Sequence, residues 1–316
     1  MGILFVDHHD TTLAIEQGNL VLRVPDAPGP RHLPLALIER VVLRARTQLD
    51  SQTLATLADA GIGVIAHGGR GGQRVAQILG AAGNDARRRI AQVRKLDDAA
   101  HVLHWSQTLI RAKLRAQRRF IASLMQQRPD QRKPLFDAFE TLGATLQRLP
   151  RVRTVESVRG LEGAAAAAYF AGFASVLPPE LGFTQRNRRP PRDPVNACLS
   201  LGYTLLHSLL VETIYAHGLD PMIGYLHVPE HGRASLAADL MEPWRPWIDR
   251  RVHALFRSRR LSAEHFGRDG GDACIMGKAG RQHFYTDWAQ AAPPLRRALR
   301  RPMHEVLRAI SPDLSL

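Results

Sequence analysis

The chain has little of several features that define whole classes of protein. Its 316 residues include only two cysteines, Cys198 and Cys274, which are too few for a disulfide framework or a Cys-rich zinc site. No stretch reaches about 18 uncharged apolar residues, so we expect no transmembrane helix. The N-terminus has no basic segment, and its apolar run is too short for a signal peptide. These absences predict a soluble cytoplasmic protein with no membrane partner.

Negative charge is also in short supply. The chain has 43 lysine and arginine residues against 29 aspartate and glutamate residues, which gives a formal net charge of +14. Such an excess predicts attraction to nucleic acid or to an anionic membrane surface. Most of the basic residues are arginines, whose guanidinium groups bind phosphate through paired hydrogen bonds. Because no amphipathic segment rich in aromatic residues is evident, we favour nucleic acid as the partner.

The first 80 residues are mostly typical of β-strands. Short β-prone runs separated by turn residues occupy residues 3–6, 12–15, 20–24, 38–43, 63–67 and 75–79. Gln17-Gly18-Asn19 predicts a hairpin turn, and residues 51–60 predict one short helix. The glycine-rich residues 68–72 lack the Gly-Lys-Ser/Thr of a phosphate-binding loop and precede a strand rather than a helix. We interpret them as a flexible turn, with Arg70 as a candidate phosphate contact.

From residue 86 onward the hydrophobic period is helical. The expected helices cover residues 99–127, 134–149, 155–176, 194–217, 236–256 and 294–310. In the first of them the apolar positions share one face, and the basic positions, Lys113 among them, lie mostly on the other faces. The predicted fold class is α+β, with a small β-rich N-terminal domain, residues 1–82, followed by a larger all-α domain, residues 83–316.

One glutamate stands out in the expected helix 155–176. Glu162 precedes a glycine and five alanines, and the helix carries no further charge up to its end. A buried charge in such a small-residue segment is costly unless it is paired or bound to a metal. Two roles for Glu162 follow from the local sequence: a functional metal ligand, or an ion pair with Arg159 on the neighbouring turn.

A histidine and two acids form a second candidate group further along the chain. His227 follows an apolar run, while Asp239 and Glu242 are three residues apart, a spacing that places two acids on one helix face. An imidazole and carboxylates suit a hard divalent cation. The alternatives are a structural histidine and two solvated acids facing a helix dipole. Other histidines compete for any metal role: His207, His217 and His231.

A basic loop precedes the expected helix 194–217. Its arginines are Arg186, Arg188, Arg189 and Arg192. Such a run is often only a solvated surface. In a chain this basic, contact with DNA phosphates is an equally good interpretation.

Several short motifs follow one another between about residues 155 and 255. In order they are Leu161-Glu162-Gly163, Tyr169-Phe170, Asp193-Pro194-Val195-Asn196-Ala197, Leu201-Gly202-Tyr203, Gly218-Leu219-Asp220-Pro221, Ile223-Gly224-Tyr225-Leu226-His227, Ser235-Leu236, Asp239-Leu240-Met241-Glu242-Pro243-Trp244-Arg245-Pro246 and Asp249. Together, this series resembles the CRISPR-associated integrase of the spacer-acquisition complex. The N-terminal part agrees only in its length and β character. Several motifs in the right order are far more specific than any one of them.

The resemblance implies roles for individual residues. The first acid of the family falls on Glu162, its histidine on His227, and its later acids on Asp239 and Glu242, although many members carry aspartate at the last position. Glu162, His227 and Glu242 are then the expected ligands of Mg²⁺ or Mn²⁺, since no thiolate favours zinc. Asp239 is expected to be a further ligand or a supporting group. The implied DNA-binding residues are the four arginines of the basic loop and Arg245.

The resemblance also implies a reaction and partners. The 3′-hydroxyl of a captured DNA duplex attacks a phosphodiester at the repeat boundary of the CRISPR array, and water as the nucleophile gives an endonuclease. His227 is either a metal ligand or the general acid, and one or two metals are equally open. The expected partners are double-stranded DNA, a second copy of the chain joined through the β domain, and a small ferredoxin-like second CRISPR adaptation protein. The alternatives are a transposon-type integrase or nuclease outside CRISPR immunity, and a non-catalytic DNA-binding protein whose acids are only ion-paired.

Overall fold

The computed structural model describes residues 2–43, 45–68, 74–78, 86–187, 190–268 and 270–310. Its described residues form two compact units. The first draws on Met1–Arg89, Val211–Leu219 and Trp288–Leu316, and the second on Ile90–Leu210 and Asp220–Asp287. The predicted domain boundary between residues 82 and 83 lies outside the described residues and stays a prediction. Arg70 and most of the predicted flexible turn also lie outside them.

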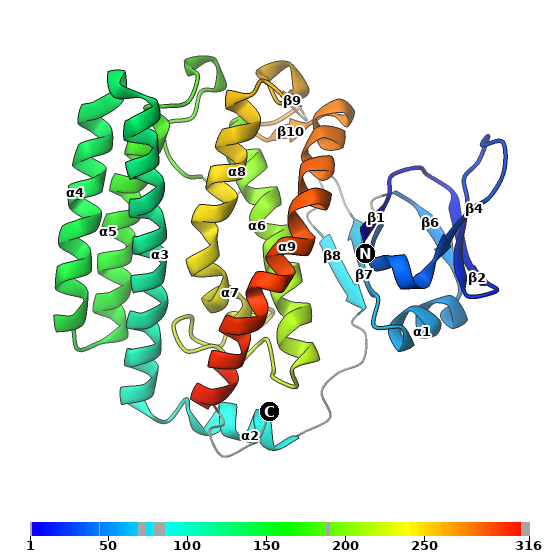
Figure 1. The fold of residues 1–316 in the computed structure, drawn as a ribbon, viewed down its shortest axis with the longest axis horizontal. Helices are drawn as coiled ribbons and strands as arrows, with labels where there is room; N and C mark the ends of the chain where they lie inside the picture. The colour runs from blue at the N-terminus through cyan, green and yellow to red at the C-terminus, as the bar shows by residue number, and fades with distance from the viewer. Residues whose placement is uncertain are drawn as a thin grey trace. The chain divides into compact units, whose positions relative to one another are not determined.

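The first unit contains two four-stranded β-sheets (Figure 1). One has the strand order β1-β5-β7-β8, with β1 (Gly2–Val6), β5 (Ile38–Leu43), β7 (Gly63–Gly68) and β8 (Arg74–Ile78). In this sheet β1, β5 and β7 are parallel, and β8 is antiparallel to β7. The other has the order β4-β3-β2-β6, with β2 (Thr11–Glu16), β3 (Asn19–Arg23), β4 (Arg31–Pro34) and β6 (Thr47–Leu49).

Local sequence explains several features of this unit. Gln17 and Gly18 have positive φ angles of 47° and 74°, as a two-residue hairpin turn between β2 and β3 requires, so the predicted hairpin is confirmed. Asp50 begins helix α1 (Ser51–Asp59), because its carboxylate accepts the backbone N–H of Thr53 at 2.6 Å. Apolar residues of both sheets and α1 form one core, including the fully buried Leu57.

The helices begin with α2 (Ala86–Arg94), α3 (Ala99–Gln127), α4 (Arg132–Arg148) and α5 (Val155–Ala174), and continue with α6 (Pro194–Ala216), α7 (Ser235–Met241), α8 (Arg245–Arg257) and α9 (Lys278–Ile310). Short 3-10 turns are η1 (Leu35–Leu37), η3 (Pro129–Gln131), η4 (Leu149–Arg151), η5 (Pro179–Leu181), η6 (Glu242–Trp244) and η7 (Ala263–His265). The predicted helix 99–127 is confirmed residue for residue. The predicted helix 236–256 is two helices, α7 and α8, because Pro243 lies in the turn η6 between them.

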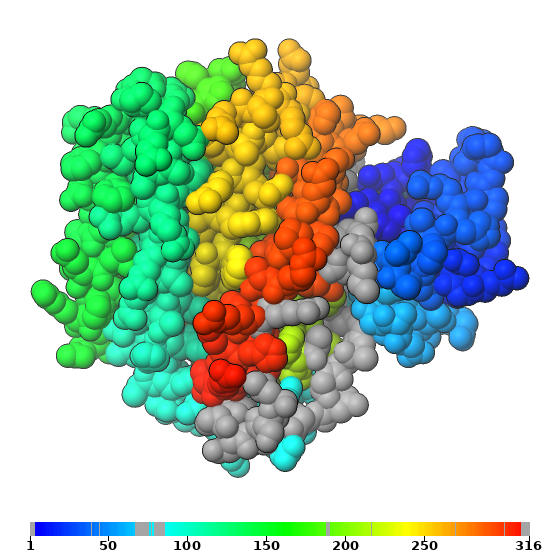
Figure 2. All heavy atoms as spheres, in the orientation of Figure 1, coloured from blue at the N-terminus to red at the C-terminus, as the bar shows by residue number. Residues whose placement is uncertain are grey.

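Helices α3, α4 and α5 lie side by side in the second unit (Figure 1), and in the space-filling view α3 and α4 form a continuous surface (Figure 2). Small residues allow the close approach of α5. A Cβ atom added to Gly172 would lie 2.8 Å from the Cβ of Ala138 on α4. The aromatic side chains of Phe120, Tyr169 and Phe173 fill the buried interface between α3 and α5. This packing directs Glu162 of α5 towards α3.

The C-terminal part is largely helical rather than all-α, which corrects one detail of the predicted fold class. A two-stranded antiparallel sheet joins β9 (Phe266–Arg268) and β10 (Cys274–Met276). Each strand has only three residues, too few for a period-2 pattern to be recognised. The wider prediction, an N-terminal β region followed by helices, is confirmed.

The last helix is also longer than predicted. Helix α9 begins at Lys278 and continues through Pro293, Pro294 and Pro302, although the sequence indicated a start at Pro294. Proline disfavours a helix interior. Buried apolar residues after the first prolines, such as Leu295, Leu299 and Met303, supply packing that outweighs this local preference.

Within the described ranges of the chain, one helix is apolar enough to span a membrane by length and composition alone. This is α6, over the window Pro194–Tyr215, and 61% of the window is buried inside the protein. Such burial is that of a core helix, which passes the same test of length and composition.

Candidate active site

Glu162 lies beside a buried lysine rather than beside the arginine considered from the sequence. Its Oε1 accepts a short hydrogen bond from the Nζ of Lys113 on α3. Arg159 points elsewhere and donates from Nε and Nη2 to the backbone carbonyl of Leu226. The expected alternative pairing of Glu162 with Arg159 is therefore wrong, because Arg159 is engaged by the loop that carries His227.

Glu242 lies between two cations. Its Oε2 accepts a hydrogen bond from the Nζ of Lys113 at 2.5 Å, and its Oε1 accepts one from the Nε of Arg245 at 2.7 Å. Burial opposes ionisation of this carboxyl, but the charges of Lys113 and Arg245 outweigh that effect and lower the pKa of Glu242 to about 2. Glu162 and Glu242 thus converge from α5 and η6 on the same ammonium group.

Asp239 on α7 is fully buried and organises the chain around His227. Its Oδ2 accepts the backbone N–H groups of Tyr225 and Leu226 at 2.7 and 2.9 Å. Its Oδ1 accepts the backbone N–H of His227 and its ring Nδ1–H, both at 2.8 Å. A carboxylate offers about four lone-pair sites, and these four bonds use them. The bond from Nδ1 leaves the lone pair of the imidazole on Nε2.

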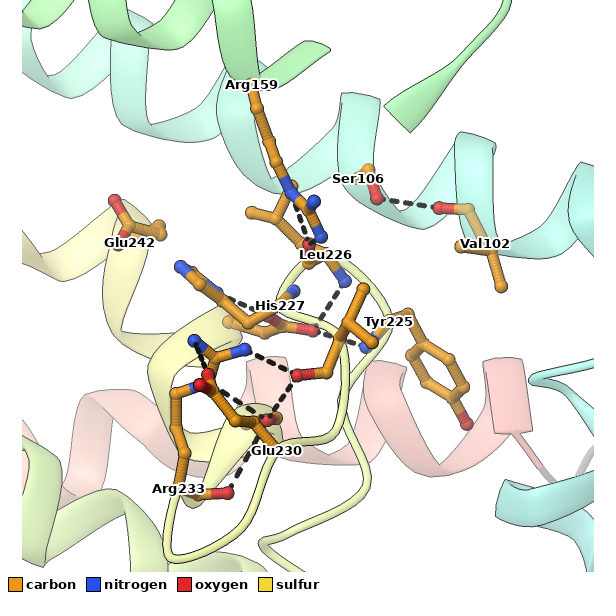
Figure 3. A network of polar contacts seen from close by, with 12 residues as sticks. Val102, Ser106, Arg159, Tyr225, Leu226, His227, Glu230, Arg233 and Glu242 are labelled. Carbon is orange, nitrogen blue, oxygen red and sulfur yellow. Dashed lines mark hydrogen bonds and ion pairs between the residues drawn. The ribbon is translucent and has the colours of Figure 1, made fainter. Parts of the chain in front are cut away.

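The loop between α6 and α7 is held at several points (Figure 3). Arg159 binds it at Leu226, and the Arg233 guanidinium donates to the carbonyl of Val228. At its start, the Nε2 of the fully buried Gln92 donates to the carbonyls of Asp220 and Ile223, both at 2.8 Å. These bonds fix the backbone on both sides of His227, whose ring extends towards the side where Glu242 lies in Figure 3.

Gly224 is required where this loop meets α7. A Cβ atom there would lie 2.5 Å from the carbonyl carbon of Ser235 and 2.8 Å from the backbone nitrogen of Leu236. Because backbone atoms cannot yield at such distances, no other residue fits without moving the loop that carries His227.

The competing histidines have other surroundings. His217 bonds through Nδ1 to the carbonyl of Thr213 at 2.7 Å. Burial lowers the pKa of His207, which also bonds the backbone of Ala234. His231 is exposed. Of the four histidines considered from the sequence, His227 is the one that the structure fixes through a buried carboxylate.

A ready-made metal cluster is not present in the part of the chain that the structure describes, where no three His, Cys, Asp or Glu side chains surround one point. At this site the ammonium of Lys113 lies between Glu162 and Glu242. The donor set itself, two carboxylates and an imidazole nitrogen, suits Mg²⁺ or Mn²⁺. The carboxylates of Glu162 and Glu242 both contact the positive charge of Lys113.

The predicted DNA-binding arginines differ in their surroundings. Arg186 donates to Asn196 Oδ1 at 2.6 Å and to Ser200 Oγ at 3.0 Å. Arg245 bonds Glu242 and lies over the ring of Tyr203, 4.6 Å from its centre. Arg192 is exposed, with a distant ion pair of 3.9 Å. The remaining two, Arg188 and Arg189, lie outside the described residues.

Sequence reasoning assigned no role in the site to three supporting residues. Asp249 is buried and accepts the hydroxyl groups of Tyr169 and Tyr203, which joins α5, α6 and α8, and burial raises its pKa to about 6. Gln92 gave no signal within its short arginine-rich helix. Lys113 did give one: it lies four residues after Leu109 and is therefore on the apolar face of α3, where it is buried. The expectation that grouped it with the basic positions of the other faces is wrong for this residue.

Buried acids, a fixed imidazole and neighbouring guanidinium groups are side chains of the kind found in a class of enzymes that act on phosphodiesters. The family model described as "CRISPR associated protein Cas1" matches residues 4–290. The chain therefore belongs to the Cas1 family, and the family predicted from the ordered motifs is confirmed.

Curated relatives support this assignment. A "CRISPR-associated endonuclease Cas1 1" from Thermodesulfovibrio yellowstonii is 32% identical over 293 residues, 92% of this chain and 91% of the relative. A "CRISPR-associated endonuclease Cas1 3" from Thermus thermophilus is 33% identical over 275 residues, 86% of this chain and 79% of the relative. The predicted enzyme class, a CRISPR-associated endonuclease, agrees with both names.

Solved structures share the fold. A CAS1 protein from Thermotoga maritima has a TM-score of 0.84 at 19% identity and covers 98% of this chain and 97% of its own. A casposase bound to integration product also has a TM-score of 0.84, at 21% identity, covering 100% of this chain and 92% of its own. A Cas6-RT-Cas1–Cas2 complex has a TM-score of 0.75 at 22% identity, covering 91% of this chain and 32% of that one.

Proposed function

We propose that this CRISPR-associated endonuclease of the Cas1 family joins short DNA fragments to the CRISPR array by transesterification at the site around Glu162, His227 and Glu242. The observation that carries the proposal is the convergence of Glu162 and Glu242, from separate elements, on one buried positive charge beside a fixed imidazole. The family match favours this function over that of a transposon-type integrase or a non-catalytic DNA-binding protein.

Glu162, Glu242 and Nε2 of His227 would hold Mg²⁺ or Mn²⁺. The family is typically metal-dependent, and oxygen and nitrogen donors without thiolates suit these ions. When bound, such an ion stabilises the extra charge on a phosphate under attack and lowers the pKa of the attacking hydroxyl. The same three side chains can serve one ion or share two.

The protein side chains supply position and proton control. Asp239 holds Nδ1–H of His227, so that Nε2 is the ring nitrogen available for chemistry. Nε2 can act as a ligand or, once protonated, donate its proton to the leaving 3′-oxygen of the cut strand. Arg245 secures Glu242 in its ionised form. Asp239 thus acts as a positioning residue, since its own oxygens are fully used.

The basic side chains would hold the DNA. We assign phosphate contacts to Arg188, Arg189 and Arg192 of the basic loop. Arg186 and Arg245 would add DNA contacts while keeping their protein partners, because a guanidinium group has five donors. Affinity carried by such contacts falls steeply with salt concentration.

The proposed partners are double-stranded DNA, a second copy of the chain and the small ferredoxin-like second CRISPR adaptation protein, in the cytoplasm. A solved Cas1–Cas2-containing complex of the same fold supports the small partner, and a casposase bound to integration product supports DNA. We propose dimerisation through the β domain, residues 1–82, and catalysis by residues 83–316.

Strand transfer provides the test. A labelled duplex with a free 3′-hydroxyl is incubated with a CRISPR-repeat plasmid, with and without Mn²⁺ and the small partner. Glu162→Ala should abolish joining while DNA binding persists. The matched control is Glu156→Ala, an exposed acid in the first turn of the same helix, which should remain active. Full joining by Glu162→Ala would contradict the proposed site.

A further inference from the structure

Lys113 is the only cation that contacts both candidate metal-binding carboxylates among the described ion pairs. It extends from the middle of α3, and its side chain is 7% exposed. Its Nζ donates to Oε1 of Glu162 and, at 2.5 Å, to Oε2 of Glu242. The two acids are 80 residues apart in the chain (242 minus 162), so this ammonium joins α3, α5 and η6 at one point.

The arrangement balances buried charge. An unpaired carboxylate or ammonium in a protein interior is strongly unfavourable, and removal of one partner leaves the others uncompensated. Lys113 and Arg245 together neutralise Glu162 and Glu242. A divalent cation that bridges the same two carboxylates would lie where the ammonium of Lys113 lies, and it repels the ammonium at close range. Lys113 and the metal therefore compete for one position.

We propose that Lys113 is an exchangeable counter-ion of the active site. Its ammonium holds Glu162 and Glu242 together, gives up this position to the divalent cation, and takes a phosphate of the bound DNA as its new anionic partner. Metal and DNA then bind cooperatively, because a DNA phosphate provides an anionic partner for the ammonium that the metal displaces. This inference rests on the proposed function of the site and adds a positioning residue that couples its two ligands.

The geometry distinguishes this role from an ordinary ion pair. Lys133 on α4 represents the ordinary case: its ammonium bonds one exposed acid, Asp137, at 3.1 Å, with 86% of its own side chain exposed. Lys113 instead bonds two acids at once and is nearly inaccessible. An exposed pair contributes little to stability and competes with no ligand.

Binding of Mn²⁺, followed by electron paramagnetic resonance of the free ion, tests the proposal without use of catalysis. The variants are Lys113→Met, Lys113→Arg and the matched control Lys133→Met, each with and without a DNA duplex. Without DNA, Lys113→Met should bind Mn²⁺ about tenfold more tightly than the unchanged protein, since tenfold equals about 1.4 kcal/mol, the scale of one charge-assisted hydrogen bond. DNA should tighten Mn²⁺ binding in the unchanged protein and in Lys133→Met, but not in Lys113→Met. Lys113→Arg, which keeps the charge, should keep the response to DNA.

Equal or weaker Mn²⁺ binding by Lys113→Met, or an unchanged response to DNA, would overturn the inference. Glu162→Ala separates this result from failure of the metal site itself: if it binds Mn²⁺ like the unchanged protein, the proposed metal site is wrong. If Lys113→Met is unfolded without metal, its melting temperature is measured at increasing Mn²⁺ concentration. The proposal requires a larger rise for Lys113→Met than for Lys133→Met, and an equal rise contradicts it.

Discussion

The two halves of the active site are built on opposite electrostatic plans. In the carboxylate half, Glu162 and Glu242 are brought together by a cation, Lys113. In the imidazole half, His227 is fixed by an anion, Asp239, which also gathers three backbone N–H groups. The carboxylate half depends on the ammonium of Lys113, which a divalent cation can replace. A half held by four hydrogen bonds to one buried carboxylate is preorganised before any ligand arrives.

The largest effect is expected from removing the anion of the imidazole half. Asp239→Ala leaves the buried backbone N–H groups of Tyr225 and Leu226, and both the backbone N–H and the Nδ1–H of His227, without their acceptor. We expect a loss of about 3–5 kcal/mol in the free energy of unfolding, measured by urea denaturation, together with loss of strand transfer. The control is Asp220→Ala, in the same loop, whose carboxylate accepts one exposed backbone N–H, from Met222. Similar losses for the two variants would refute the organising role of Asp239.

The carboxylate half should be distinguished by its response to acid. The pKa of Glu242 is lowered from an ordinary 4.5 to about 2, so its contribution to stability is fully present above pH 4.5 and is lost as the pH falls towards 2. Urea unfolding between pH 5 and 2 should therefore show a shallower loss of stability in Glu242→Gln than in the unchanged protein. Parallel curves would show that Lys113 and Arg245 do not hold Glu242 ionised.

A smaller effect is expected at the outer support of the imidazole half. Gln92→Ala removes the side-chain bonds to Asp220 and Ile223 and should cost about 1–3 kcal/mol of stability. Strand transfer should fall as well, because the loop that carries His227 is loosened. Gln107→Ala is matched to it, since Gln107 also donates to two carbonyls, those of Leu149 and Val152, far along the chain from His227. If both variants lose activity alike, Gln92 has only a structural role.

The smallest effect concerns DNA binding outside both halves. Replacing Arg188 and Arg189 together by alanine should weaken DNA binding and make its dependence on salt less steep, by about 0.9 in the logarithmic slope for each DNA phosphate that the variant no longer neutralises. Fluorescence anisotropy with a labelled duplex at several salt concentrations measures both quantities. Mn²⁺ binding should stay unchanged. An unaltered slope would remove the basic loop from the DNA-binding surface.

Much of this protein could be predicted from its sequence. The long helices follow from a 3.6-residue period, and α3 matches its predicted bounds. Ordered motifs identified the family and the four candidate residues. The short strands β4, β6, β9 and β10 escaped prediction because three or four residues carry too little periodicity. The first half of α9 was not predicted because the prolines within the helix disfavour helix locally, whereas tertiary packing stabilises it.

The sequence by itself determined which residue types are available, which face of each helix is apolar and in what order the acids and the histidine occur. Only the tertiary structure decided their partners. Lys113 meets Glu162 across 49 residues and Glu242 across 129, and Asp239 meets His227 across a folded loop. Helical periodicity indicates that a side chain is buried but not which residues it contacts. The contacts of Lys113 are set by the packing of α3 against α5 and η6, because a buried charge is stable only beside an opposite charge.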